Sequence, residues 1–366
     1  MKKIETMAFL VEPSSYTLDL VEHLYKPMGI EYTFLHKSPL IARAEKNLDA
    51  PTLADYSWIK KIEYLLRIRK RYDLIIFNGY NYPEFLFLFF MNLISSDKKV
   101  IAIESDTQAK PDRGVKGLLK RLFLGSVFKS PYILGFSGGG YVHKDLFRKY
   151  GMDEERIFLM PMMVNNEKFR RPADQKHTLK NPFVFLYVGR IIPHKNVEML
   201  IKSFMAAFKE QDDVTLRIVG RGESLDELKK AYKDVSNIRF EGAKFADDLV
   251  KTYHTSHVLV IPSLYEPWGL VVNEAMAAGL PVLASSRVGA IHDLIEKRET
   301  GFVFDPENIE ELASLMQKVY KEKGLYEKLS SNAAATMSQY WNYDLYRENL
   351  LKAIEYAGQK VNGAIS

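Results

Sequence analysis

Residues 264–284 read LYEPWGLVVNEAMAAGLPVLA, and this stretch decides the fold. The apolar run at 258–262 before it predicts a buried strand, while Gly279 and Pro281 end a helix before another strand begins. A strand, a tight loop and a helix in this order leave unpaired backbone N–H groups at about 269–272. These donors, together with the positive end of the helix dipole, predict a phosphate-binding site.

Two carboxylates flank this loop, Glu266 before it and Glu274 on the first turns of the helix, with seven residues between them. Carboxylates do not bind phosphate, so we expect them to accept hydrogen bonds from hydroxyl groups beside it. A phosphate with hydroxyls on both sides describes a nucleotide sugar. The alternative is an ordinary strand-to-helix connection that carries two solvated acids.

A second loop supplies positive charge. The apolar run Phe183–Val188 predicts a parallel strand that ends at Gly189, and Arg190 and Lys195 follow before a predicted helix at Asn196–Lys209. Open α/β sheets bind ligands at the carboxyl ends of their strands. Two cations there would neutralise a pyrophosphate, the arginine as a fork and the lysine as a point charge. Surface solubility is the alternative explanation for both.

These segments, in this order, resemble the family-four retaining glycosyltransferases, which have the GT-B fold. The resemblance is carried by the Glu pair at 266 and 274, by Gly269 and by the Gly-Arg…Lys segment. It implies that Glu266 contacts the donor sugar, that Glu274 contacts the ribose diol and that two further turns flank the base. The donor-binding residues implied are Gly189, Arg190, Lys195, Gly220, Arg221, Ala243, Glu266, Gly269, Leu270, Val271 and Glu274.

The sequence departs from the family pattern in the first half of the chain. Many members have a Gly-Gly loop after the first strand, where this chain reads Glu12-Pro-Ser-Ser-Tyr16. Many also have a His after the fourth strand, where this chain reads Glu104-Ser105-Asp106. Ser105 or Asp106 can take a related role, and we place Asp106 with Arg190, Lys195 and Glu266 as the predicted catalytic residues.

The resemblance implies an α/β protein of GT-B type, with two Rossmann-like parallel-sheet domains facing across a cleft. The length of 366 residues suits two domains. We expect an N-terminal acceptor-binding domain at 1–172, a linker at Arg171–Leu179 and a C-terminal donor-binding domain at 173–341. A terminal helix within 342–366 is expected to cross back onto the first domain.

Composition excludes several kinds of site. The chain has no cysteine, so it has no disulfide, no thiolate nucleophile and no cysteine zinc site. His254 and His257 are expected to be structural, and no Asp-x-Asp lies in a loop where a metal would hold a diphosphate. We therefore expect no metal and no cofactor, the nucleotide sugar being a substrate. The small charge excess and the lack of a known reader motif argue against nucleic acid.

Positive charge is concentrated in the first half. Lys and Arg exceed Asp and Glu by six in residues 1–175 and fall short by one in residues 176–366. The excess gathers at 115–129, where apolar side chains fall at helical spacing. The ordinary interpretation is a domain helix that packs this stripe on its own sheet, and the alternative is an interfacial helix on anionic lipid. The Phe-rich stretch Phe85–Ile94 is too short to span a membrane and is either a core helix or a contact for a lipid acceptor.

The resemblance implies a hexosyltransferase that acts with retention. We expect a UDP-sugar donor in preference to a GDP-sugar, and a saccharide or lipid-linked saccharide acceptor in capsule, exopolysaccharide or lipopolysaccharide O-antigen assembly. With no apolar run of about 18 residues and no signal-peptide cleavage pattern, we expect a cytoplasmic protein, with peripheral contact at the inner membrane face as an open alternative. The rival classes are a nucleotide-sugar epimerase, a non-catalytic nucleotide-sugar binder and a dinucleotide oxidoreductase. The last lacks the third glycine, since Leu225 stands in its place.

Overall fold

The computed structural model describes residues 3–37, 51–172, 182–209 and 213–363. The chain divides into two compact units, which we call unit 1 (Met1–Met162 with Tyr343–Ser366) and unit 2 (Met163–Asn342). The predicted linker at 171–179 falls mostly on residues outside the described ranges.

Unit 1 is built on a six-stranded, all-parallel sheet in the order β2-β1-β3-β4-β5-β6. Its strands are buried almost throughout, which is why they read as apolar runs in the sequence. They are β1 (Thr6–Leu10), β2 (Glu31–Phe34), β3 (Leu74–Asn78), β4 (Val100–Ser105), β5 (Ile133–Ser137) and β6 (Ile157–Leu159).

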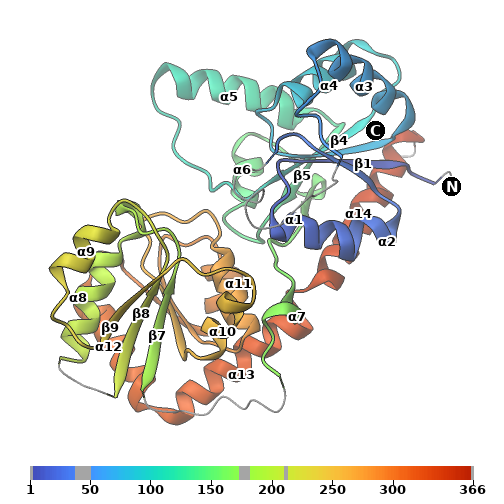
Figure 1. Ribbon diagram of the computed structural model, residues 1–366. Coiled ribbons are helices and arrows are strands. Elements are labelled where there is room, and N and C mark those ends of the chain that lie inside the picture. Colours follow the sequence, from blue (N-terminus) through green and yellow to red (C-terminus); the bar gives the residue numbers. More distant parts are fainter. Residues whose placement is uncertain (1–2, 38–50, 173–181, 210–212, 364–366) are drawn as a thin grey trace. The chain divides into compact units, whose positions relative to one another are not determined.

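Helices cover both faces of this sheet. Helices α3, α4 and α5 lie on one face, and α1, α2 and α14 lie on the other (Figure 1). Right-handed crossovers produce this division, because the chain moves from β1 to β2 in one direction and from β2 to β5 in the other. The helices are α1 (Ser15–Leu20), a π-helical turn (Val21–Tyr25), α2 (Lys26–Met28), α3 (Trp58–Arg71), α4 (Pro83–Ile94), α5 (Gly114–Lys129), α6 (Lys144–Lys149), a 3₁₀ turn (Glu154–Arg156) and α14 (Tyr343–Val361).

The last helix, α14, is part of unit 1 although it follows unit 2 in the sequence. The hydroxyls of Tyr346 and Tyr25 lie 3.3 Å apart, both in the buried interior. Further along α14, the ring of Tyr356 meets that of Phe158 edge to face at 6.0 Å. The helix therefore completes the cover of this sheet face.

Unit 2 contains a second six-stranded parallel sheet, in the order β12-β11-β10-β7-β8-β9. The order reverses between β7 and β10, so the loops after these two strands leave the sheet in opposite directions and open a crevice between them. The strands are β7 (Phe183–Val188), β8 (Val214–Val219), β9 (Ile238–Gly242), β10 (Val258–Ile261), β11 (Val282–Ser285) and β12 (Gly301–Phe304).

The helices of unit 2 pack on both faces of this sheet, and an apolar core of phenylalanine, leucine and valine side chains lies between the layers. They are α7 (Asn166–Phe169), a 3₁₀ turn (Pro193–Lys195), α8 (Val197–Ala207), α9 (Leu225–Ala231), α10 (Ala246–His254), α11 (Leu270–Ala277), a π-helical turn (Ile291–Glu296), α12 (Ile309–Lys321) and α13 (Lys323–Gln339).

The boundary between the units lies ten residues before the predicted one, at 162/163 instead of 172/173. The segment after Met162 belongs to unit 2 because α7 is bonded to it. The Asn166 amide donates to the carbonyl oxygens of Met337 (2.7 Å) and Trp341 (2.9 Å). The return to unit 1 falls at 342/343.

The apolar stripe of α5 does not pack on its own sheet, and this corrects the ordinary interpretation of that helix. Val115, Leu118, Leu119 and Leu122 are all exposed, while Leu124, Val127 and Phe128 at the other end of α5 enter the core. None of the helices in the described ranges combines the length and the apolar character that a membrane crossing requires.

Candidate active site

A cavity of about 190 Å³ lies at the crevice between β7 and β10. It is formed by the loop after β7 and by the loop and first turn of α11 after β10. Its walls are Tyr187, Val188, Gly189, Arg190, Lys195, Ile261, Ser263, Glu266, Gly269, Leu270 and Val271. Seven of the predicted site residues therefore meet in one place, although they come from segments about 80 residues apart.

The central interaction of this cavity is an ion pair. The Lys195 ammonium binds the Oε2 atom of Glu266, and the two side chains are only 12% and 17% exposed. Such a pair is held more firmly than a surface salt bridge because solvent screens it less. Lys195 thereby fixes the direction of the Glu266 carboxylate, and each group faces the cavity with a defined orientation.

The backbone around Glu266 is also fixed. Its N–H donates to the carbonyl oxygen of Arg287 at 3.2 Å, and its own carbonyl oxygen accepts from Gly289 N–H at 3.0 Å. On the opposite wall, the Tyr187 hydroxyl donates to the carbonyl oxygen of Arg190 at 2.7 Å, and the Arg190 side chain is exposed. Both loops are therefore preorganised before any ligand binds.

The start of α11 forms the floor of the cavity. Gly269 adopts φ +98°, and an added Cβ would lie 3.2 Å from Glu266 Cγ, so glycine is needed at this approach. Trp268 anchors the turn, because its Nε1 donates to Asn273 Oδ1 at 2.8 Å and its ring stacks on Trp341 at 5.3 Å. The helix N-terminus consequently presents its free N–H groups near Arg190 and Lys195, where an anion would be held.

Gly220, Arg221 and Ala243 do not line the cavity. The N–H of Gly189 donates to Val219 O at 3.0 Å, and that of Gly220 donates to Gly242 O at 2.8 Å, so the turns after β7, β8 and β9 form a bonded series. A Cβ on Gly220 would lie 1.8 Å from the carbonyl oxygen of Gly189. The glycine at 220 thus permits the close approach that shapes the cavity wall.

Glu274 lies one turn further along α11 and also stands outside the cavity wall. It accepts a hydrogen bond of 2.5 Å from the Tyr253 hydroxyl of α10. Burial raises the pKa of the Glu274 carboxyl to about 7, although the Tyr253 hydrogen bond acts in the opposite direction. Burial therefore disfavours the charged form of this carboxyl, and additional hydroxyl donors would favour that form.

Asp106 directly follows β4 and belongs to unit 1. Glu104, the penultimate residue of β4, is a nearby buried carboxyl whose pKa is shifted. It accepts hydrogen bonds from the Asn78 amide at 2.5 Å and from the Tyr346 hydroxyl. Burial, with a smaller contribution from the charge of Asp106, raises the pKa of its carboxyl to about 7, although the Asn78 and Tyr346 hydrogen bonds act in the opposite direction.

The sequence reasoning missed four residues that contribute to these sites: Ser263, Tyr187, Tyr253 and Asn78. Ser263 lines the cavity, and its hydroxyl is buried without a hydrogen-bond partner among the described residues. A signal existed for Ser263 and Asn78, because each follows or ends a buried strand at the carboxyl edge of its sheet. No sequence signal pairs Tyr253 with Glu274.

The two histidines expected to be structural have structural contacts. His257 Nδ1 accepts from Val184 N–H at 2.9 Å and its ring stacks on Phe183, while His254 Nε2 lies 2.8 Å from Phe169 O. Within the ranges that the structure describes, no group of three His, Cys, Asp or Glu side chains is arranged to hold a metal ion.

Solved structures define the class of fold. Anabaena HepE, solved in complex with UDP, matches 96% of this chain over 100% of its own, with a TM-score of 0.75 and 18% identity. WaaG, a glycosyltransferase involved in lipopolysaccharide biosynthesis, matches 98% of this chain over 100% of its own, with a TM-score of 0.66 and 15% identity. The predicted class, α/β with two parallel sheets of GT-B type, is confirmed.

The sequence comparisons agree with the resemblance. Residues 169–336, a little under half of the chain, match the family model of the group 1 glycosyl transferases. An uncharacterized glycosyltransferase of Methanocaldococcus jannaschii is 34% identical over 164 residues, which are 44% of this chain and 42% of the relative. The chain spans about half the length of the curated relatives it matches.

Proposed function

We propose that this protein is a retaining glycosyltransferase that moves a hexosyl group from a nucleotide diphosphate sugar to a saccharide or lipid-linked saccharide. The observation that carries the proposal is the cavity at the sheet reversal of unit 2. It combines Arg190, Lys195 and the N-terminus of α11 with the oriented carboxylate of Glu266. Cations and helix N–H groups suit a diphosphate, and a fixed carboxylate suits the hydroxyls of a sugar.

In this reaction the bond between the anomeric carbon and the diphosphate breaks, and the diphosphate leaves with the electron pair. Arg190, Lys195 and the N–H groups at 269–271 stabilise that departing charge. Removing one preorganised donor of this kind lowers the rate by roughly 10²–10³. The acceptor hydroxyl oxygen bonds to the anomeric carbon from the face that the diphosphate leaves and gives its proton to the departing diphosphate, which gives retention with no protein nucleophile.

Roles for the carboxylates follow from their places. Glu266 accepts from a hydroxyl of the donor sugar while Lys195 holds it in position. Glu274 accepts from the ribose, where the diol adds donors to the one that Tyr253 supplies. Asp106 takes the place of the family's donor-site histidine. The turns at Gly220, Arg221 and Ala243 hold the base through backbone groups.

The finer assignments are also proposals. A UDP-sugar is favoured because HepE, of the same fold, is solved with UDP. An acceptor in capsule, exopolysaccharide or lipopolysaccharide assembly is favoured by the likeness to WaaG and by the basic, apolar helices of unit 1. We place the reaction in the cytoplasm, at the inner face of the membrane. Because two cations supply the charge for the diphosphate, turnover should persist in excess EDTA.

The first test is thermal stability with UDP, GDP, CMP and NAD, for the wild type and Glu274→Ala. A ligand at about 100 times its Kd stabilises by about 2.7 kcal/mol. A shift with one nucleoside diphosphate that Glu274→Ala largely loses supports the donor site. A shift with NAD alone would contradict it.

The second test measures transfer and its stereochemistry. Arg190→Ala and Lys195→Ala should each lower turnover by roughly 10²–10³ with the fold intact. Lys202→Ala is the matched control, since Lys202 is an exposed cation of α8 paired only at the surface with Glu198. Conversion of the donor sugar without any acceptor would instead indicate an epimerase, and binding without transfer or hydrolysis a non-catalytic binder.

A further inference from the structure

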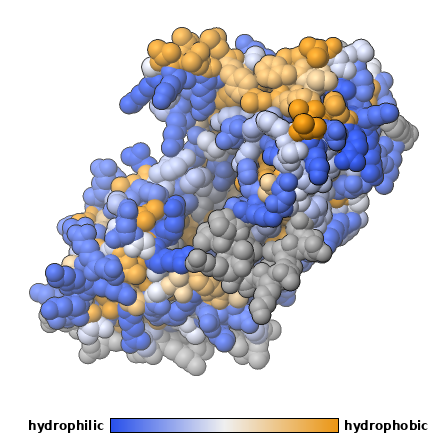
Figure 2. Space-filling view, turned by 45° about the horizontal axis from the view of Figure 1, so that its top comes forward, coloured by the Kyte–Doolittle hydropathy of each residue, from blue (hydrophilic) through white to orange (hydrophobic). Residues whose placement is uncertain are grey.

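Three helices on one face of unit 1 leave large apolar side chains exposed. Figure 2 shows hydrophobic surface gathered along the top of this unit, over α5 and over α3 and α4. We call this surface the apolar face. Its members are Trp58, Ile59, Ile62 and Leu66 of α3, Phe90, Leu93 and Ile94 of α4, and Val115, Leu118, Leu119 and Leu122 of α5.

The apolar face is a regular feature of these helices and not a scatter of single residues. The exposed positions of α5 are spaced i, i+3, i+4 and i+7, so they form one stripe, and Val115 is 74% exposed. Helix α4 is apolar around its whole circumference. Phe85, Leu88 and Phe89 enter the core while Ile94, on the opposite side, is 81% exposed. A helix of that kind is normally buried on all sides.

The three helices are neighbours, which makes the surface continuous. Lys61 of α3 pairs with Glu84 of α4 at 2.8 Å. Tyr80, just before α4, meets Phe128 of α5 edge to face at 6.1 Å. Exposed apolar surface of this extent marks a contact site and is not typical of a free surface.

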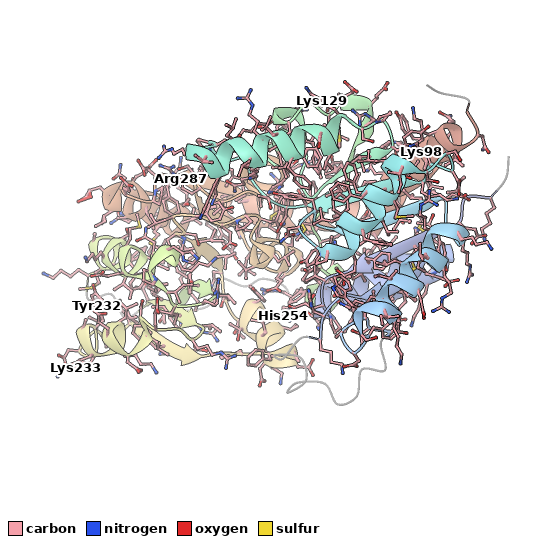
Figure 3. All side chains as sticks on the ribbon, turned by 90° about the horizontal axis from the view of Figure 1, so that it is seen from above. Lys98, Lys129, Tyr232, Lys233, His254 and Arg287 are labelled. Atoms are coloured by element: carbon pink, nitrogen blue, oxygen red, sulfur yellow. The ribbon has the colours of Figure 1, made fainter. Side chains whose placement is uncertain are left out.

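The three helices of the apolar face carry a large excess of positive charge. Helices α3, α4 and α5 carry ten Lys and Arg side chains against two acids, Glu63 and Glu84, and Glu84 is already paired with Lys61. Viewed over these helices, Lys129 lies at the end of α5 and Lys98 lies beyond the end of α4 (Figure 3). Cations therefore lie beside the exposed apolar side chains, as Lys116 and Arg121 do on α5.

We propose that the apolar face is a membrane-docking surface that seats in the interfacial region of a bilayer containing anionic lipid. The leucines of α5, the end of α4 and the first turns of α3 enter the acyl boundary. Lys116, Arg121 and the basic residues of α3 meet the phosphate groups, their aliphatic stems lying along the apolar surface. A lipid-linked acceptor would reach unit 1 from this surface.

A second copy of the chain is a poorer occupant. Twofold association would place the same patch against itself, so the excess cations of α3 and α5 would face their own copies. Like charges across an interface are unfavourable, whereas anionic headgroups neutralise the same cations. The charge pattern thus favours lipid over self-association.

The chain carries its own reporter for this docking. It has three tryptophans, of which Trp58 is exposed on the apolar face while Trp268 and Trp341 are buried and stacked on each other. A shift of tryptophan emission to the blue on adding vesicles therefore reports on Trp58. Bromine-labelled lipid chains should quench the same emission, and Trp58→Phe should abolish both effects.

The test is co-flotation and emission with vesicles of phosphatidylglycerol and phosphatidylcholine, compared with phosphatidylcholine alone. Binding should require the anionic lipid and weaken between 0.1 and 0.5 M salt, values set by the screening length. Leu118→Gln/Leu119→Gln/Leu122→Gln should weaken it at least tenfold. Lys116→Gln/Arg121→Gln should weaken it roughly 10- to 30-fold on anionic vesicles only.

Leu351→Gln is the matched control, because Leu351 is an exposed leucine of α14 on the other face of the same sheet. It should bind vesicles as the wild type does. Absence of vesicle binding, or equal loss in the Leu351 variant, would overturn the proposal. So would a dimer in lipid-free solution that the triple leucine variant dissociates. No donor is present in these measurements, so their outcome is separate from that of the donor site in unit 2.

Discussion

Replacing Glu274 with Gln should make the protein more stable at alkaline pH and remove one titration from its stability profile. Burial raises the pKa of this carboxyl from an ordinary value of 4.5 to about 7. The folded state therefore holds the proton more tightly than the unfolded chain does. The stability that this group contributes is complete below pH 4.5 and is lost as the pH rises through 7.

The magnitude follows from the width of that window. One pKa unit is worth 1.36 kcal/mol. Compared with a side chain that stays neutral, a carboxyl shifted by about 2.5 pKa units therefore destabilises the fold by roughly 3 kcal/mol at pH 8 and by about 1 kcal/mol at pH 5. Glutamine keeps the shape and can still accept from the Tyr253 hydroxyl, but it cannot ionise. The free energy of unfolding of the variant, relative to that of the wild type, should therefore rise by about 2 kcal/mol between pH 5 and pH 8.

Urea unfolding at pH 5, 6, 7 and 8 measures this difference, read from the transition of unit 2 if the two units unfold separately. Glu310→Gln removes an exposed acid of α12 in the same unit and should leave the profile unchanged. A Glu274→Gln variant that is no more stable relative to wild type at pH 8 than at pH 5 would refute the reasoning. Nucleotide should also stabilise the wild type more at pH 8 than at pH 6, because ribose hydroxyls favour the ionised carboxylate.

Three further outcomes are expected. Gly220→Ala should abolish nucleotide binding and lower the melting temperature, because its Cβ would lie 1.8 Å from Gly189 O, whereas Gly324→Ala, with nothing within 4 Å, should be neutral or slightly stabilising in the same thermal scan. Ser263→Ala should leave the melting temperature unchanged, because the hydroxyl has no partner to lose, and should weaken nucleotide binding about 5- to 10-fold by calorimetry. Burial raises the pKa of Glu104 to about 7, so Glu104→Gln should make unit 1 more stable than in the wild type as the pH rises through 7, as at Glu274. Urea unfolding over the same pH series measures this difference.

The sequence predicted the second sheet well because its strands are buried on both faces. Phe183–Val188 is matched to the residue by β7, and the run at 258–262 differs from β10 by one residue at its end. Parallel strands of this kind appear as short apolar runs bounded by glycine or proline, so local information is sufficient. The loops between them, and hence the cavity, follow from where the strands end.

Pairings over long distances could not be predicted in this way. Lys195 and Glu266 are 71 residues apart, and nothing local shows that each is the other's partner. The same holds for Tyr253 and Glu274, which determine how a buried carboxyl titrates. An apolar stripe shows which side of a helix avoids water but not what covers it, which is why the sequence could not show that the stripe at the start of α5 stays exposed while the end of the helix enters the core.

The return of α14 to unit 1 has a consequence for synthesis of the protein. Unit 2 is one continuous stretch, Met163–Asn342, whereas unit 1 needs residues from both sides of that stretch. On the ribosome, unit 2 emerges complete while one face of the unit 1 sheet still lacks the helix that brings Tyr346 to Tyr25. The part of that sheet face that α14 covers therefore stays open in the nascent chain until this helix has been made.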